Sequence, residues 1–154
     1  MTNDETFVLP LGAAAALPGA GDANTYMAVV RNGRYWLIDC ADGPIQRLLA
    51  AGLDPLAVEG IFITHFHPDH VYGLPAYALG LYLLAKKRED PWPNPLPIYA
   101  HPGVLGRVKR LLELFSAQNW LDTLPLEYRP VATEVGAQVA GTPAFNVTAA
   151  PGCH

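Results

Sequence analysis

The ten residues from position 61 to position 70, IFITHFHPDH, constrain the fold of this chain more than any other stretch. The first three are β-branched or aromatic, which is typical of a buried strand. Three histidines and an aspartate follow within six residues, and the proline among them is incompatible with a strand ladder or a helix interior. We therefore predict a tight loop at a strand end. His65 and His67 would share one face of it, with Asp69 and His70 close by.

The crowding of these four side chains indicates a metal site. Neutral imidazole together with carboxylate suits Zn, Mn or Fe better than Mg or Ca. The alternative is a loop of ordinary polar residues. It leaves unexplained why four groups of the ligand type fall within six positions.

Residues 65–70 match the H-x-H-x-D-H motif, and through it the sequence resembles the metallo-β-lactamase superfamily. The surroundings resemble its ribonuclease Z, arylsulfatase and phosphodiesterase branch, where a strand and an Asp-Cys-Gly-type turn precede the motif, as residues 36–43 do here. The resemblance implies an α/β fold, the four-layer αββα sandwich. Residues 1–154 would form a single domain of this kind, truncated after about the first half of the fold.

The resemblance also assigns ligands for two divalent ions, with zinc expected and manganese or iron as alternatives. His65 and His67 would bind the first ion together with His154, the last residue of the sequence. Asp69 and His70 would contribute to the second ion, and Asp69 would also orient or deprotonate the attacking water. The bridging carboxylate and the last histidine of the family would lie beyond these residues.

The activity that the resemblance implies is that of a metal-dependent hydrolase, a phosphodiesterase of the ribonuclease Z kind that uses a metal-bound hydroxide. Its substrate would be a small-molecule ester or phosphodiester, with RNA as a further candidate. The same centre serves sulfatases, lactonases, thioesterases and β-lactamases, so the motif does not separate these activities. An alternative of another class is a catalytically incomplete metal-binding fragment, because the bridging carboxylate is missing.

Several other residues have a role that the sequence leaves open. Asp39 follows a strand and would either support the metal loop or cap the next helix. His101 opens a helix and is expected in a surface turn, with a substrate contact as the alternative. Cys40 and Cys153 are expected to be small buried residues, although Cys153 stands beside a predicted ligand.

Two short basic groups are expected to be solvated helix faces: residues 86–88, and Arg107 with Lys109 and Arg110. On a polynucleotide substrate they would instead lie along phosphates.

The composition limits the class of protein. Hydrophobic residues make up 51% and charged residues 16% of the chain, which is typical of a globular protein with a sizeable core. A net charge of −4 gives no general attraction to nucleic acid or to an anionic membrane. With two distant cysteines, an acidic N-terminus and no apolar run of the ~20 residues that a membrane span needs, we expect a cytoplasmic protein. The apolar face left by half a sandwich would favour a homodimer.

The remaining pattern predicts alternating strands and helices. Asn32-Gly33 indicates a hairpin, and Asp42 is the expected N-cap of the helix that follows it. A strand, a helix and a second strand then form a crossover unit. Strands are expected at residues 7–12, 24–31, 35–39, 61–63 and 98–100, with two or three more between 126 and 150, and helices at 42–51, 74–88 and 104–115. Residues 90–97, with four prolines, are expected to be irregular.

Overall fold

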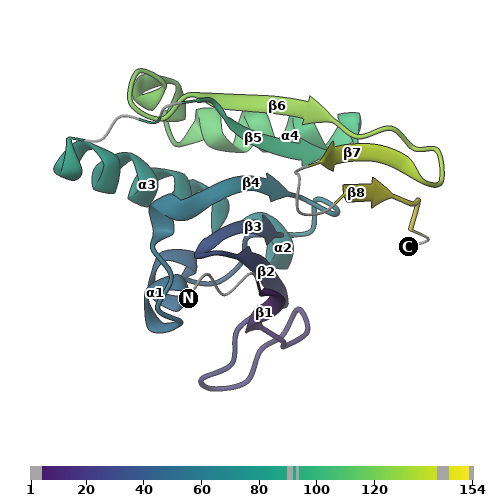
Figure 1. Ribbon diagram of the computed structural model, residues 1–154, viewed down its shortest axis with the longest axis horizontal. Coiled ribbons are helices and arrows are strands. Elements are labelled where there is room, and N and C mark those ends of the chain that lie inside the picture. Colours follow the sequence, from purple (N-terminus) through teal and green to yellow (C-terminus); the bar gives the residue numbers. More distant parts are fainter. Residues whose placement is uncertain (1–4, 90–91, 93, 142–145, 153–154) are drawn as a thin grey trace.

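The structure is a computed structural model that describes residues 5–89, 92, 94–141 and 146–152. Six strands form one mixed sheet in the order β1-β2-β3-β4-β5-β6 (Figure 1). Strands β1, β2 and β3 are antiparallel, whereas β3, β4, β5 and β6 run parallel to one another. Their bounds are β1 (Thr6–Gly12), β2 (Tyr26–Arg31), β3 (Arg34–Ile38), β4 (Val58–Phe62), β5 (Leu96–Ala100) and β6 (Leu126–Pro130).

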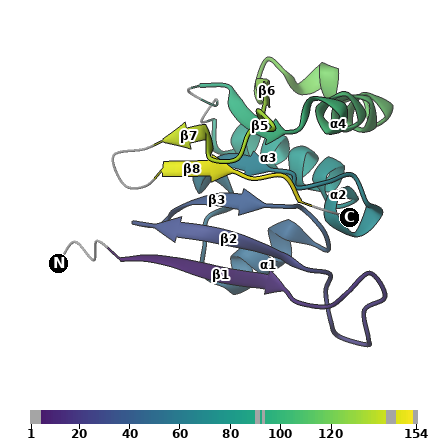
Figure 2. The ribbon, with the colours of Figure 1, turned by 90° about the vertical axis from the view of Figure 1, so that its right-hand side faces the viewer.

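A second, two-stranded antiparallel sheet and a set of helices lie against the large sheet. Figure 2 shows the small sheet in front of the six-stranded sheet, with α1 and α3 behind it. The small sheet consists of β7 (Ala137–Gly141) and β8 (Asn146–Ala149). Together with β6 they are the two or three strands predicted between residues 126 and 150. The helices are α1 (Pro44–Ala50), α2 (Pro68–Val71), α3 (Leu74–Arg88) and α4 (Pro102–Leu114), with 3-10 turns at Pro55–Ala57 and Ala117–Trp120. None of the described helices combines the length and apolarity needed to cross a bilayer.

The predicted hairpin is confirmed between β2 and β3. Asn32 and Gly33 both have positive φ, at 52° and 75°, which is the backbone of the two-residue turn that matches strand twist. The crossover is also confirmed, because α1 connects β3 to β4 and these two strands are parallel. These local signals place β3 and β4 side by side, and the ends of these two strands carry most of the site.

The predicted N-cap of the first helix is wrong. Gly43, not Asp42, is the N-cap of α1, and no side chain caps this helix. Gly43 has a φ of 52°, a left-handed conformation that glycine adopts without penalty, and Pro44 then begins the helix with a φ already suited to it. Asp42 therefore lies one residue too early for its carboxylate to cap the first turn.

Most element boundaries differ from the predicted ones by one to three residues, and β4 covers residues 58–62 where 61–63 were predicted. The differences at β5 and α4 have a local physical cause. Strand β5 begins at Leu96, inside the stretch expected to be irregular. The ladder with β4 begins only at Ile98, so the missing N–H of Pro97 breaks no bond on that side. Helix α4 begins at Pro102, two residues early, because the His101 side chain caps its first turn and proline suits that position.

The core lies between the parallel strands and the helices. Its members on β3, β4 and β5 include Leu37, Ile61 and Ile98, which are buried together with helix residues such as Leu48, Tyr77 and Leu81. Helix α3 has the predicted bounds and is buried along one side, whereas Leu79 and Leu83 are 39% and 52% exposed.

Candidate functional site

The polar side chains of interest follow the ends of three neighbouring parallel strands. Asp39 comes directly after β3, residues 63–67 come after β4, and His101 comes after β5. The carboxyl ends of parallel strands meet at one edge of a sheet, which is where α/β proteins commonly bind their ligands. The order of the strands therefore brings these three segments together.

The structure brings four of the five predicted metal ligands together. The ring centroids of His65 and His67 are 4.6 Å apart, and those of His65 and His70 are 4.1 Å apart. The His70 Nε2 atom lies 3.5 Å from Oδ2 of Asp69. The fifth predicted ligand, His154, lies outside the described residues, so its meeting with this cluster stays a prediction.

The predicted tight loop is wrong for the second half of the motif. Residues 63–67 have no regular structure, but Pro68 opens the short helix α2, which carries Asp69 and His70. Proline is excluded only from a helix interior, and at the first position its missing N–H has no intrahelical partner to lose. The one turn of helix places Asp69 and His70 beside the rings of the preceding residues.

A buried carboxylate, Asp39, holds residues 64–70, which we call the histidine segment, through contacts at both ends of it. It accepts a hydrogen bond from the Thr64 backbone N–H at 2.8 Å and one from the Thr64 hydroxyl at 2.8 Å. The His70 Nδ1 atom lies 2.7 Å from Oδ2 of Asp39, and Asp39 is 5% exposed. The supporting role predicted for Asp39 is therefore confirmed, and the helix-capping role is wrong.

These contacts determine which nitrogen of two histidines carries the proton. Since an ionised carboxylate only accepts, the His70 Nδ1 must be the donor to Asp39. Since the Thr64 hydroxyl donates to Asp39, the His65 Nδ1, 3.0 Å from that oxygen, must donate to it. In the neutral rings, Nε2 of both histidines is then the nitrogen with the lone pair. This arrangement is the one by which carboxylates orient metal-binding histidines.

The backbone around Asp39 is tightly constrained. Asp39 has a φ of 61°, a left-handed conformation that is uncommon outside glycine and that clusters at functional sites. The next residue, Cys40, donates its N–H to the His70 carbonyl and accepts from the Gly73 N–H. A Cβ added at Gly73 would lie 1.6 Å from the Ala41 carbonyl oxygen, so only glycine permits this approach. Cys40 is a buried free thiol, as predicted, and burial raises its pKa well above the usual value.

The donor set fits a divalent metal ion in chemistry. Imidazole and carboxylate groups are the ligands that zinc takes, and the protonated Nδ1 atoms leave Nε2 as the ligand atom of His65 and His70. Among the residues that the structure describes, no group of three or more His, Cys, Asp or Glu side chains has the geometry to hold a metal ion.

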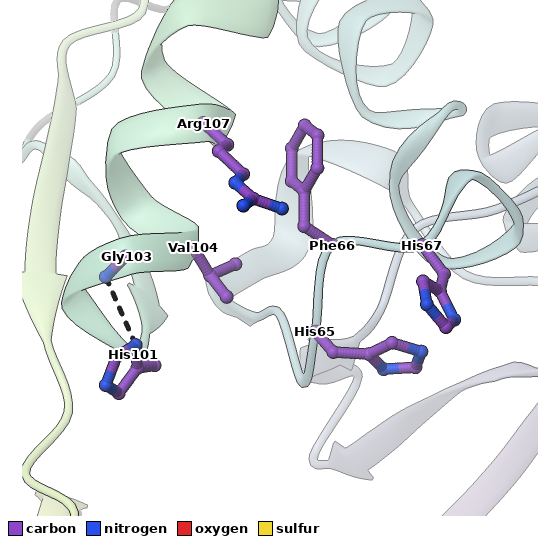
Figure 3. Close-up of a pocket in the computed structure, with 7 residues that line it drawn as sticks. All are labelled: His65, Phe66, His67, His101, Gly103, Val104 and Arg107. Carbon is purple, nitrogen blue, oxygen red and sulfur yellow. Dashed lines mark hydrogen bonds between the residues drawn. The ribbon is translucent and has the colours of Figure 1, made fainter. Parts of the chain in front are cut away.

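A pocket opens on one side of the histidine segment (Figure 3). It has a volume of about 440 Å³ and is lined by His65, Phe66, His67, His101, Gly103, Val104 and Arg107. The guanidinium carbon of Arg107 lies 5.8 Å from the centre of the Phe66 ring, so α4 contacts the histidine segment directly. His101 is exposed, as predicted, and its Nδ1 accepts the Gly103 N–H at 3.1 Å.

A second pocket, of about 540 Å³, lies beside Asp69 and has a different character. It is lined by Ala16, Pro18, Asn24, Asp42, Pro68, Asp69 and Tyr72. Desolvation raises the pKa of Tyr72 to about 12, and the Asp42 carboxylate adds to this rise. Its hydroxyl therefore stays protonated at neutral pH and can donate to Asn24 Oδ1, 3.3 Å away.

Two residues of the site were not predicted from the sequence. Thr64 bridges Asp39 and His65, and only its position before the first histidine pointed to it. Arg107 was expected in a solvated basic group, with a place along the phosphates of a polynucleotide as the alternative, and its contact with Phe66 was not predicted. Its three-residue spacing from Val104, which puts both on one face of α4, was the available signal.

Comparisons with known proteins show what this chain is similar to. A family model described as anti-Pycsar protein Apyc1 matches residues 7–94. Ribonuclease Z of Salinibacter ruber is 42% identical over 90 residues, which cover 58% of this chain and 27% of that protein. Ribonuclease Z of Methanothermobacter thermautotrophicus is 31% identical over 145 residues, which cover 94% of this chain and 43% of that protein.

A solved structure extends the likeness to the fold. The short form of human tRNase Z superposes with a TM-score of 0.66 at 27% identity, over 80% of this chain and 45% of that one. The chain thus spans less than half the length of the relatives that it matches here. The metallo-β-lactamase fold protein YhfI of Bacillus subtilis superposes with a TM-score of 0.65 at 15% identity, over 88% of this chain and 50% of that one, which confirms the predicted metallo-β-lactamase fold.

Proposed function

The chain belongs to the metallo-β-lactamase superfamily, within the family of the anti-Pycsar protein Apyc1, and on this basis we propose that it forms the metal-binding part of a hydrolase that cleaves phosphodiesters. The observation that carries the proposal is the buried Asp39 carboxylate, which orients His70 directly and His65 through Thr64. A structural role alone gives no reason for two imidazoles to be held with the same nitrogen protonated.

In this proposal the chain binds divalent ions, which the metallo-β-lactamase fold implies, and zinc is the metal we favour. His65 and His67 would hold a first ion together with His154, and Asp69 and His70 would contribute to a second. Ions bound there would supply Lewis acidity and make a water molecule acidic enough to ionise near neutral pH.

The residues of the chain would position this chemistry. Asp39 keeps the proton of His70 on Nδ1 and so keeps its Nε2 available as a ligand atom, beside the Asp69 carboxylate. Asp69 would accept the proton of the attacking water, because it is the carboxylate nearest to the rings that stays outside the Asp39 network. Phe66 and Val104 form the apolar wall of the adjoining pocket and would limit access of bulk water from that side.

The proposed substrate is a phosphodiester, either a small molecule or RNA. Two of the relatives are named for ribonuclease Z activity, and this supports RNA as a substrate of the longer proteins. A cytoplasmic location is part of the proposal, since the buried free thiol of Cys40 suits a reducing compartment. A homodimer that covers the exposed leucines of α3 is also proposed.

The experiment compares metal content and hydrolysis in the wild-type chain and two variants. The chain is loaded with Zn²⁺, dialysed and assayed by elemental analysis, then tested on bis-p-nitrophenyl phosphate, an aryl sulfate, a lactone and a β-lactam. His67→Ala should lose most of the bound metal and the turnover. His101→Ala removes one imidazole outside the histidine segment and should keep the metal.

Each outcome decides one part of the proposal. Full metal content and full activity in His67→Ala would refute the ligand assignment. A preference for the sulfate, the lactone or the β-lactam would replace the phosphodiesterase with another hydrolase of the same fold. Metal binding without any turnover would identify the chain as a catalytically incomplete metal-binding module.

A further inference from the structure

The pocket beside the histidine segment has a charge character opposite to that of the whole chain. Its polar lining consists of one arginine and three histidines, and none of the described residues that line it is acidic. The chain as a whole carries a net charge of −4, with 14 acidic and 10 basic residues. The second pocket, lined by Asp42 and Asp69, shows that carboxylates do gather at this edge of the sheet. The pocket of about 440 Å³ thus offers an anion a site whose described lining residues carry no negative charge.

Arg107 is the charged group of this pocket. Its guanidinium lies over the face of the Phe66 ring, 5.8 Å from the ring centre, and Figure 3 shows the two side chains approaching from α4 and from the histidine segment. A cation over an aromatic face keeps the N–H groups at its edge available. Those N–H groups form a planar fork that matches two oxygens of a phosphate. The ring therefore holds the guanidinium in place, and its donors remain for a ligand.

His101 adds a neutral donor to the same pocket. Its Nδ1 accepts the Gly103 N–H at 3.1 Å, so in the neutral ring the proton is on Nε2. The contact also fixes the ring, because it forms the N-terminal cap of α4. The pocket thus places one cation and one N–H donor next to His65 and His67, the proposed ligands of the first ion.

We propose that this pocket binds a second phosphate group of the substrate, one linkage away from the phosphodiester that is cleaved. Arg107 makes the ionic contact, and His101 is a further donor in the lining of the same pocket. The inference rests on the proposed function, since that function places the reacting phosphate at the neighbouring histidines. It makes the preferred substrate a phosphodiester that carries a further phosphate, as an oligonucleotide or a phosphorylated dinucleotide does, and not one with a single charge.

The test measures binding without metal, so that it does not depend on catalysis. Affinities of the EDTA-treated chain are measured by calorimetry for the dinucleoside monophosphate UpU and for the same dinucleotide with a 5′- or a 3′-phosphate, pUpU and UpUp. The wild type should bind one of the phosphorylated forms about tenfold more tightly than UpU, as expected for a charge-assisted contact. A 5′ or 3′ preference would show on which side the second phosphate lies.

Three variants change the pocket, and a fourth removes a charge elsewhere on the same helix as a control. Arg107→Gln should abolish the tenfold preference, and Arg107→Lys should keep only part of it because the planar fork is lost. His101→Asn keeps a side-chain acceptor for the Gly103 N–H and should lower the preference about threefold. Arg110→Gln removes the same charge from the same helix outside the pocket, and it should leave the preference unchanged.

The result separates this inference from the proposed function. Equal affinity of the wild type for all three dinucleotides, or equal losses in Arg107→Gln and Arg110→Gln, would overturn the phosphate pocket. The hydrolysis of bis-p-nitrophenyl phosphate by the zinc-loaded wild type, which needs no second phosphate, reports on the proposed function alone. An Arg107-dependent preference in a protein that binds metal without turnover would support the pocket and leave the chain as a catalytically incomplete metal-binding module.

Discussion

The buried Asp39 network yields the most direct test of how the histidine segment is held. We consider Asp39→Asn, which keeps the shape of the side chain and tolerates the positive φ, and Asp39→Ala, which does neither. Asp39 accepts hydrogen bonds from the Thr64 N–H, the Thr64 hydroxyl and the His70 ring, at 2.7 to 2.8 Å. The residue is 5% exposed, so water does not replace these contacts.

The magnitude follows from counting the donors that lose their acceptor. A hydrogen bond to a charged group contributes about 1.5–3 kcal/mol, and a buried donor left without a partner costs a similar amount. Asparagine retains one oxygen, so Asp39→Asn should lower the free energy of unfolding by about 2–3 kcal/mol. Asp39→Ala loses all three acceptor contacts and adds strain at a φ of 61°, and it should cost about 4 kcal/mol or more.

The assay is urea unfolding of the metal-free chain, followed by tryptophan fluorescence and circular dichroism. Thr64→Val removes only the hydroxyl, and it should couple to Asp39→Asn by about 1 kcal/mol in a double-mutant cycle. Asp122→Asn, at an exposed position, should change the stability by less than about 0.5 kcal/mol. A cost for Asp39→Asn as small as that of the control, or additive effects of the two network variants, would refute the reasoning.

Two further predictions concern the close backbone approach and the buried phenols. Gly73→Ala should destabilise the chain by about 3 kcal/mol or more in the same urea assay, because its Cβ would lie 1.6 Å from a carbonyl oxygen. Gly106→Ala is the control: its Cβ would have open space, and it should raise the stability by up to ~1 kcal/mol. Burial raises the pKa of Tyr35 and of Tyr77, so above about pH 10 the unfolded chain loses phenolic protons that the folded chain keeps, and stability falls as the pH rises. Tyr77→Phe should make this fall shallower between about pH 9 and 11, and a slope equal to that of the wild type would contradict the assignment.

The parts of the fold that were predictable are those set by neighbouring residues. Asn32-Gly33 determines its hairpin through two positive φ angles, and the apolar run before the histidines determines β4. Strand β5 was predicted two residues too short. Whether Pro97 interrupts the sheet depends on which neighbouring strand its missing N–H would face. That information lies in the sheet and not in the local sequence.

The same distinction holds for the site. Four of the predicted metal ligands were found together because their spacing in the sequence already brings them close. The contact of Arg107 with the Phe66 ring was not predicted, because the ring is 41 residues away and meets Arg107 only through the pairing of β4 with β5. Asp39 was left with two roles for a similar reason, since its contact with His70 spans 31 residues. Long-range contacts of this kind decide what a residue does.

The three strand ends of the site lead to residues with different roles, and this affects how related proteins can change. Strands β3 and β4 end in the residues that orient the imidazoles, whereas β5 leads into α4 and its arginine. Substitutions along the exposed face of α4 leave the buried carboxylate and its hydrogen bonds untouched. Under the proposed function, substitutions on α4 would therefore change substrate selectivity, in nature or by engineering, without altering the residues after β3 and β4 that orient the imidazoles.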